Sequence, residues 1–115
     1  MFFISTVIGI RSKLGLEATA ALVAKSLVLP PFELDKTGRY EDQPMYLSHC
    51  FGLEFGFCHP NDATSDEYEL SIMSDDDVLD FDGNEKDVDA TAYALFLLKN
   101  AKEIETFPSP YNVST

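Results

Sequence analysis

The chain has 115 residues, of which 45% are hydrophobic and 12% aromatic, so its length and composition suit one compact domain with a core of its own. Twenty acidic side chains against eight basic ones give a formal net charge of −12 at pH 7. A protein this acidic repels phosphate backbones and anionic lipids. The charge therefore argues against direct binding of nucleic acid or a membrane surface, and favours a basic partner.

The cysteines and the N-terminal residues bear on the cellular compartment. The first apolar run has no Lys or Arg before it, and Arg11 and Lys13 follow it, which is the reverse of a secretory signal. The sequence contains no run of about 18 apolar residues, the length that spans a bilayer. On one continuous strand Cys50 and Cys58 would lie roughly 26 Å apart, too far for a disulfide, so we expect free thiols. These features predict a cytoplasmic protein.

The first third of the sequence predicts a strand followed by a helix. Residues Phe2 to Ile10 are β-branched and aromatic, which is typical of a buried strand. Ser12 can cap a helix that continues to about Leu29, with apolar residues at helical spacing. The dipeptide Pro30-Pro31 would stop this helix.

Alternating apolar and polar residues dominate the middle of the sequence. After a short alternation over 32–35, the strongest pattern extends from Met45 to Phe57 and predicts a half-buried strand. Because thirteen residues is long for one strand, we expect a bulge or bend at Gly52 or Gly56. A further alternating strand is predicted over 68–72.

The last third predicts a second helix and a tail. Asp87 or Asp89 can cap a helix from about Ala90 to Glu103. Its apolar stripe consists of Leu95, Leu98 and Ala101. The order β-α-β-β-β-α then predicts an α+β or α/β fold, with a mainly antiparallel central sheet flanked by two helices. We expect one globular domain over 1–106 and a flexible tail over 107–115.

Most of the negative charge lies in one segment. From Asn61 to Asp89 there are twelve acids and one base, a balance of −11, whereas the rest of the chain is close to neutral. A solvated loop that contacts nothing is one interpretation. A binding role is favoured because apolar residues interleave with the acids and because a basic partner would relieve the repulsion among them. The predicted partner-binding residues are Asp66, Glu67, Tyr68, Glu69, Asp75, Asp76, Asp77, Asp80, Phe81, Asp82 and Glu85.

Metal and enzyme chemistry are weaker interpretations. Aligning the acidic segment with an EF-hand loop puts Val78 at the first position, which requires a coordinating oxygen, so we expect no metal site. His49, Cys50, Cys58 and His59 could supply a nucleophile and a base, but adjacent residues on a strand point to opposite faces. The sequence also lacks phosphate-loop, dinucleotide-binding, zinc-protease and serine-hydrolase motifs. We therefore expect no catalytic residue, no cofactor and no enzymatic activity.

Three stretches, Phe32–Asp35, Gly38–Tyr46 and Phe51–Phe57, resemble small bacterial immunity proteins. These are paired with polymorphic toxins, especially in contact-dependent growth inhibition systems. In them an aromatic and acidic strand, a YE-x-x-P-x-Y turn and a long Gly-interrupted strand precede an acidic linker and a closing helix. The resemblance covers roughly Phe32 to Lys102 and carries over no catalytic or ligand residue. It implies an antitoxin that neutralises a cognate toxin, commonly a nuclease, as a stoichiometric inhibitor in the cytosol.

Electrostatics independently favours such a role. A nuclease site must attract phosphate, so an acidic inhibitor complements it and can raise association toward about 10⁸–10⁹ M⁻¹s⁻¹ at low salt. Charge alone gives little affinity, so we expect an aromatic or apolar anchor, with Tyr40, Tyr68 and Phe81 as candidates. We expect a free monomer and a 1:1 complex with a basic toxin domain. The alternative is an acidic regulatory adaptor or nucleic-acid mimic that occupies the basic site of an endogenous protein.

Overall fold

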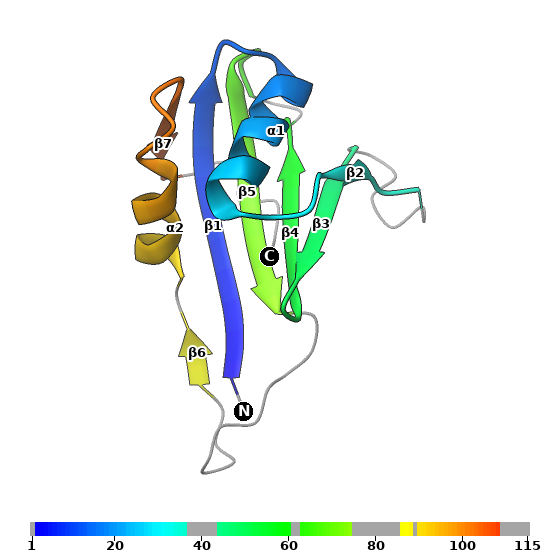
Figure 1. Ribbon diagram of the computed structural model, residues 1–115, viewed down its shortest axis with the longest axis vertical. Coiled ribbons are helices and arrows are strands. Elements are labelled where there is room, and N and C mark those ends of the chain that lie inside the picture. The colour runs from blue at the N-terminus through cyan, green and yellow to red at the C-terminus, as the bar shows by residue number, and fades with distance from the viewer. Residues whose placement is uncertain (1, 37–43, 61–62, 75–85, 89, 109–115) are drawn as a thin grey trace.

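The computed structural model describes residues 2–36, 44–60, 63–74, 86–88 and 90–108. The strands in these ranges form one mainly antiparallel sheet, and two helices pack against it (Figure 1). The predicted α+β fold is therefore confirmed. The described strands are β1 (Phe2–Ser12), β2 (Glu33–Leu34), β3 (Tyr46–Cys50), β4 (Leu53–Cys58), β5 (Glu67–Ser74), β6 (Lys86–Val88) and β7 (Ile104–Phe107), and the helices are α1 (Leu16–Leu27) and α2 (Thr91–Leu98).

Strand β1 is the centre of the topology. The order across the sheet is β2-β3-β4-β5-β1-β6, and β7 also pairs with β1. One edge of β1 pairs antiparallel with β5 along residues 5–11. The opposite edge is shared, because β6 pairs in parallel with residues 2–4 and β7 pairs antiparallel with residues 9–12. Figure 1 shows α2 beside β1, between these two short strands.

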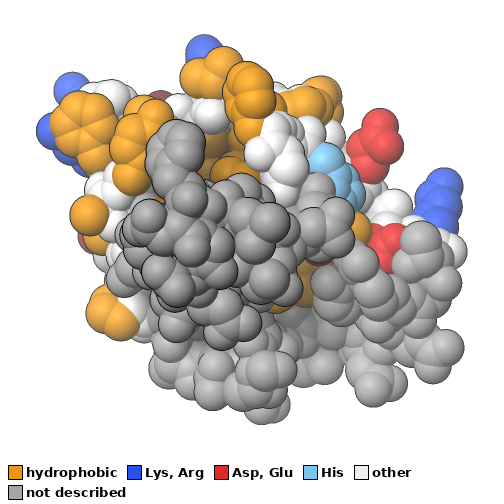
Figure 2. Space-filling view, turned by 90° about the horizontal axis from the view of Figure 1, so that it is seen from below, with side chains coloured by type: hydrophobic (Ala, Val, Ile, Leu, Met, Phe, Trp, Pro, Cys, Tyr) orange, Lys and Arg blue, Asp and Glu red, His pale blue; other side chains and the backbone are white. Residues whose placement is uncertain are grey.

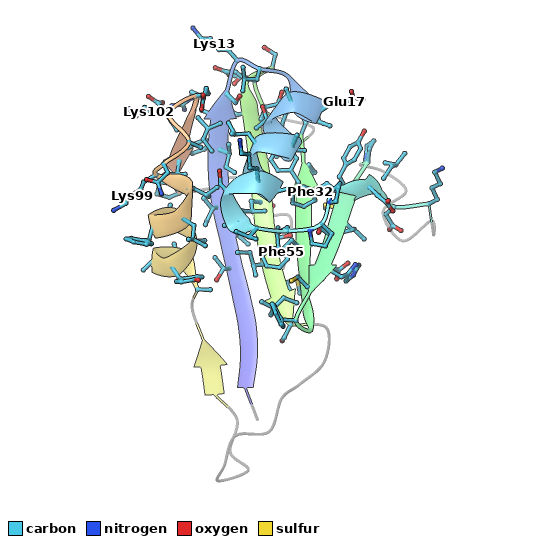
Figure 3. All side chains as sticks on the ribbon, in the orientation of Figure 1. Lys13, Glu17, Phe32, Phe55, Lys99 and Lys102 are labelled. Atoms are coloured by element: carbon cyan, nitrogen blue, oxygen red, sulfur yellow. The ribbon has the colours of Figure 1, made fainter. Side chains whose placement is uncertain are left out.

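The core lies between the sheet and the helices. Alternate residues of β1 and β5 face it, and Ile10 and Leu70 are fully buried there. Phe57 is also fully buried, and its ring stacks on Tyr68 with centroids 5.3 Å apart. Helix α1 contributes Val23 to the same cluster, as the helical spacing of its apolar residues predicts. The helix-covered side of the sheet is seen in Figure 3.

The start of α1 differs from the prediction. Ser12 is the last residue of β1 and does not cap the helix, whose N-cap is Gly15. The Ser12 Oγ instead accepts hydrogen bonds from the Leu14 N–H at 3.1 Å and from the Thr19 hydroxyl at 2.7 Å. The helix ends at Leu27 rather than near Leu29, because Val28 adopts a left-handed conformation that closes the last turn.

Residues 45–57 form the hairpin of β3 and β4 rather than one long strand, and the break falls at Gly52, one of the two glycines expected to mark a bulge or bend. Cys50 lies opposite Leu53, and Phe51 and Gly52 make the two-residue turn with φ of 52° and 74°. Positive φ at both positions is typical of a type I′ turn, which matches the twist of the two strands.

The cysteines are free in this hairpin, as predicted. Because Tyr46 lies opposite Phe57, Cys58 is beyond one end of the β3–β4 pairing and Cys50 is at the other. Their offset of about five residues corresponds to roughly 17 Å, which keeps the thiols well outside bonding distance.

The C-terminal helix is shorter than predicted, and a strand that was not predicted follows it. Helix α2 ends at Leu98, and residues up to 107 turn back to form β7 against β1. The predicted caps Asp87 and Asp89 do not begin the helix, whose N-cap is Ala90. The Ala90 N–H donates to the Thr6 hydroxyl at 2.9 Å, which ties the start of α2 to β1.

The first residue of the predicted tail lies in the sheet. Phe107 belongs to β7, and its ring covers Gly9 so closely that a Cβ at Gly9 would lie 2.5 Å from a ring carbon. The rest of that tail, 109–115, is outside the described residues. In the described part of the chain, neither helix combines the length and apolarity that crossing a membrane requires.

Candidate protein-interaction surface

The structure places four of the eleven predicted partner-binding residues, namely Asp66, Glu67, Tyr68 and Glu69. They lie at the start of β5 and on the turn before it. The other predicted residues are outside the described ranges, namely Asp75, Asp76, Asp77, Asp80, Phe81, Asp82 and Glu85, together with the anchor candidate Tyr40.

Asp66 and Glu67 make contacts within the chain. The Thr64 hydroxyl lies 2.7 Å from Asp66 Oδ1, and this hydrogen bond holds the pKa of the Asp66 carboxyl below its usual value. Glu67 Oε2 lies 3.7 Å from Arg11 Nη2, and Arg11 Nη1 donates to Glu105 Oε2 at 3.2 Å. These carboxylates therefore form a polar cluster where β1, β5 and β7 meet, and Arg11 offsets part of their charge.

Tyr68 and Glu69 lie inside the molecule, each with 3% of its surface exposed. Tyr68 stacks on Phe57 and meets the edge of the His59 ring at 5.6 Å, and burial raises the pKa of its phenol. The alternation along β5 correctly puts Tyr68 in the core. The expectation that Tyr68 and Glu69 contact a partner needs correction, because β5 is a central strand and leaves these side chains almost no free surface.

The histidines and cysteines occupy separate environments. His49 Nε2 lies 3.9 Å from Glu54 Oε1, and the histidine side chain is 56% exposed. His59 Nε2 is hydrogen-bonded to the Thr64 carbonyl at 2.8 Å. Cys58 is buried and Cys50 partly so. Within the described ranges, no three His, Cys, Asp or Glu side chains gather where they could hold a metal ion.

Helix α2 presents an apolar surface that the sequence analysis missed. Its residues from Ala92 to Leu98 are all apolar, and Ala94 and Leu98 are buried in the core. Tyr93 is nevertheless 68% exposed and Phe96 is 57% exposed. Figure 2 shows hydrophobic side chains along the upper rim of the molecule seen from below. The sequence feature that indicates this surface is a helix without a polar face. Such a helix exposes apolar side chains unless other parts of the protein cover it on every side.

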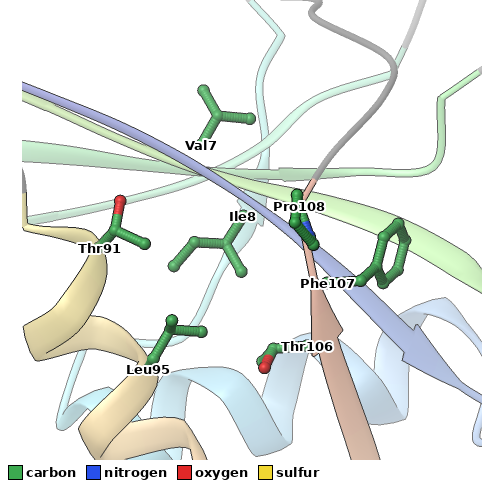
Figure 4. A pocket seen from close by; sticks show the side chains of 7 residues that line it. All are labelled: Val7, Ile8, Thr91, Leu95, Thr106, Phe107 and Pro108. Atoms are coloured by element: carbon green, nitrogen blue, oxygen red, sulfur yellow. The ribbon is translucent and has the colours of Figure 1, made fainter.

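A pocket lies on each side of α2. The first, which we call the edge pocket, has a volume of about 230 Å³ and separates α2 from β1 and β7 (Figure 4). Its lining residues are Val7, Ile8, Thr91, Leu95, Thr106, Phe107 and Pro108. The second, which we call the core pocket, has a volume of about 90 Å³ and lies between α2, the end of α1 and strands β4 and β5. Its lining residues are Leu27, Leu53, Phe55, Ile72, Ala90, Tyr93, Ala94 and Leu97.

Phe51, at the tip of the β3–β4 hairpin, is the most exposed large apolar residue in the described ranges, at 98%. Its φ of 52° is a left-handed conformation that costs a bulky residue of the order of 1 kcal/mol or more. Asn or Gly would fit this turn position better than Phe. An exposed aromatic ring held on a strained turn is a candidate contact residue.

No protein-family model, curated protein or solved structure matches the chain. The resemblance to immunity proteins therefore rests on the sequence stretches quoted above.

Proposed function

We propose that the chain is an immunity protein that binds a basic toxin domain, most simply a nuclease, in a 1:1 complex in the cytoplasm and thereby inhibits it. The observation that carries the proposal is the concentration of charge, with a balance of −11 between Asn61 and Asp89 against a nearly neutral remainder. A basic nuclease site attracts such a segment at long range, and this attraction speeds capture of the toxin.

The positions at which the acidic segment joins the sheet support this proposal, because both lie at the same end of β1. Met73, near the end of β5, lies opposite Ser5, and Lys86, at the start of β6, lies opposite Phe2. Both attachment points are therefore at the N-terminal end of β1. The acids of 75–85 are connected to one end of the molecule, which suits recognition of a single basic surface.

The structure narrows the set of residues on which the proposal depends. Asp66 and Glu67 already interact with Thr64 and Arg11, and Tyr68 and Glu69 are buried. We therefore assign the charge attraction to the acids of 75–85, which the sequence identifies.

The proposal is tested by capturing partners on the tagged protein, eluting with a salt step and identifying them by mass spectrometry. We expect one basic domain in about equimolar amount. Expressed alone, that domain should arrest bacterial growth, and co-expression of this chain should restore it. Recovery of a harmless endogenous protein would instead favour the acidic adaptor.

Two matched variants, each with three acids neutralised, test the role of the acidic segment. Replacing Asp75, Asp76 and Asp77 by Asn should lower the association rate with the captured domain by about tenfold at low salt and flatten its salt dependence. The control replaces Glu17, Glu33 and Asp35 by their amides, which removes the same charge from α1 and the β2 region. An association rate that is unchanged in the first variant, or equally reduced in the control, would contradict a role for the acidic segment.

A further inference from the structure

The core pocket is a preformed apolar cavity at the surface of the molecule. Its deeper wall includes Phe55 and Ile72, which are 7% and 3% exposed and belong to the hydrophobic core. Tyr93 also lines the pocket but is 68% exposed, so it forms part of the mouth. Because strands and helices build these walls, the cavity does not depend on a loop to form it.

The size and chemistry of the core pocket select a kind of ligand. Every lining residue has an apolar side chain apart from the Tyr93 hydroxyl, so the pocket has little to offer a charged or amide group. Its volume of about 90 Å³ is smaller than the roughly 150 Å³ cavity that holds a benzene ring. An aliphatic side chain such as Leu, Ile or Met suits the pocket better than an aromatic ring.

Charge identifies the molecule that carries this side chain. Ile72 and Ala90 both line the pocket, and the sequence between them holds eight acids and one lysine, a balance of −7. A second copy of this chain carries the same net charge of −12 and would be repelled. A basic protein would be attracted and could then insert its side chain.

The charges around the edge pocket are different from those of the sequence next to the core pocket residues. Arg11 lies over the ring of Phe107, which lines that pocket, and Lys99 lies over the neighbouring Phe96. Lys99 and Lys102 project away from the sheet on that side (Figure 3). Because Arg11 also pairs with Glu67 and Glu105, the charges beside the edge pocket partly cancel, whereas the sequence that joins Ile72 to Ala90 is strongly acidic.

We propose that the core pocket receives an aliphatic side chain of the basic partner and so provides the apolar anchor of the complex. This inference rests on the proposed function and deepens it. Tyr68, one of the predicted anchors, is buried and cannot serve this role. The core pocket serves it instead, because a partner can bury an apolar side chain there.

The test uses two synthetic peptides rich in Lys and Arg that differ only at the central residue, which is Leu in one and Ser in the other. Each is titrated into the full chain at low salt and followed by two-dimensional NMR. We expect the Leu peptide to bind about tenfold more tightly, which corresponds to about 1.4 kcal/mol. The difference should be accompanied by shifts of the Leu53, Ala90 and Tyr93 amide signals.

Two variants of α2 provide a matched comparison. Tyr93→Ser and Phe96→Ser each remove one exposed aromatic ring, but only Tyr93 lines the core pocket. Tyr93→Ser should remove most of the preference for the Leu peptide, and Phe96→Ser should keep it. Equal loss in both variants would overturn the assignment to this pocket. Circular dichroism and thermal unfolding verify that both variants fold.

The outcomes separate this inference from the proposed function. Equal, salt-sensitive binding of both peptides would overturn the pocket assignment while leaving the charge attraction intact. Tighter binding of the Leu peptide, with affinities of both peptides that do not change with salt, would support the pocket but contradict the acidic recognition on which the proposed function depends. Binding of neither peptide would count against both.

Discussion

Replacing Phe51 by Asn should make the protein more stable. Phe51 adopts a φ of 52° in the first position of a two-residue turn and is 98% exposed, so its ring adds strain without adding packing. Asn tolerates the left-handed conformation and is a preferred residue of this turn. Left-handed conformations cost an ordinary residue roughly 1–2 kcal/mol, and we expect Asn to recover about 1 kcal/mol of this.

The gain can be measured by urea unfolding. With a slope of about 2 kcal/mol per molar urea, a stabilisation of about 1 kcal/mol raises the midpoint by about 0.5 M at an unchanged slope. Phe51→Ala is the control, because it removes the ring but retains a Cβ and has no side chain that favours the turn. Its free energy of unfolding should stay within a few tenths of a kcal/mol of the parent value.

A fall in stability for both variants would refute the reasoning, because it would mean that the ring packs against the protein. No gain for Asn would show that the turn carries no strain at this position. A gain in stability together with weaker binding of the captured basic domain would identify Phe51 as a residue that contacts the partner at the expense of stability.

Three further perturbations test other parts of the structure. Gly9→Ala should destabilise the fold by about 1–3 kcal/mol in urea unfolding, because the new Cβ would meet the Phe107 ring at 2.5 Å; a neutral result would contradict the packing of β7. Tyr68 has a raised pKa, so the stability it contributes is present below pH 10.0 and declines as the pH rises further. The Tyr68→Phe variant should therefore resist alkaline unfolding better than the parent. An identical dependence of stability on pH would argue against a buried phenol. Asp66 has a lowered pKa, so the stability it contributes is present above pH 3.8, its usual pKa, and is lost as the pH falls through the lower pKa of the folded protein. The Thr64→Val variant should raise the Asp66 pKa in an NMR titration. An unchanged pKa would exclude the Thr64 hydroxyl as the cause of the shift.

The fold was predictable where one local pattern decides the structure. The β-branched N-terminal run, the apolar spacing in α1 and the alternation through Tyr68, Leu70 and Ile72 each correspond to the observed element. In these segments burial and intrinsic propensity favour the same conformation, so the tertiary structure had nothing to override.

The sequence does not reveal the hairpin because apolar residues occupy odd positions on both sides of the turn, as they would in one continuous strand. In the hairpin, however, the even-numbered residues of β3 and the odd-numbered residues of β4 lie on the same face, since Tyr46 and Ser48 lie opposite Phe57 and Phe55. The odd positions of β3 thus face away from the core, which explains why His49 is exposed. Phe51 does not indicate a turn, because the first position of such a turn is normally Asn, Asp or Gly.

The end of α2 and the surface beside it depend on contacts that are distant in the sequence. Ile104 and Phe107 fit helical spacing as well as a strand, and only the open edge of β1 decides for β7. The core pocket combines residues of α1, β4, β5 and α2, so no local pattern contains it. What the sequence did predict is the charge, which needs no fold to be counted.

The pairing of β1 has a consequence for how the chain reaches its native state. Its three strand partners are residues 67–73, 86–88 and 104–107, all of which are synthesised long after it. Long-range pairings of this kind slow folding, because a large loop must close before each contact forms. A chain shortened before Ile104 should show faster amide hydrogen exchange at residues 9–12 than the full chain, and unchanged exchange would contradict this dependence. During synthesis, β1 therefore emerges well before its partners, and its β-branched surface depends on protection from aggregation until residues 104–107 arrive.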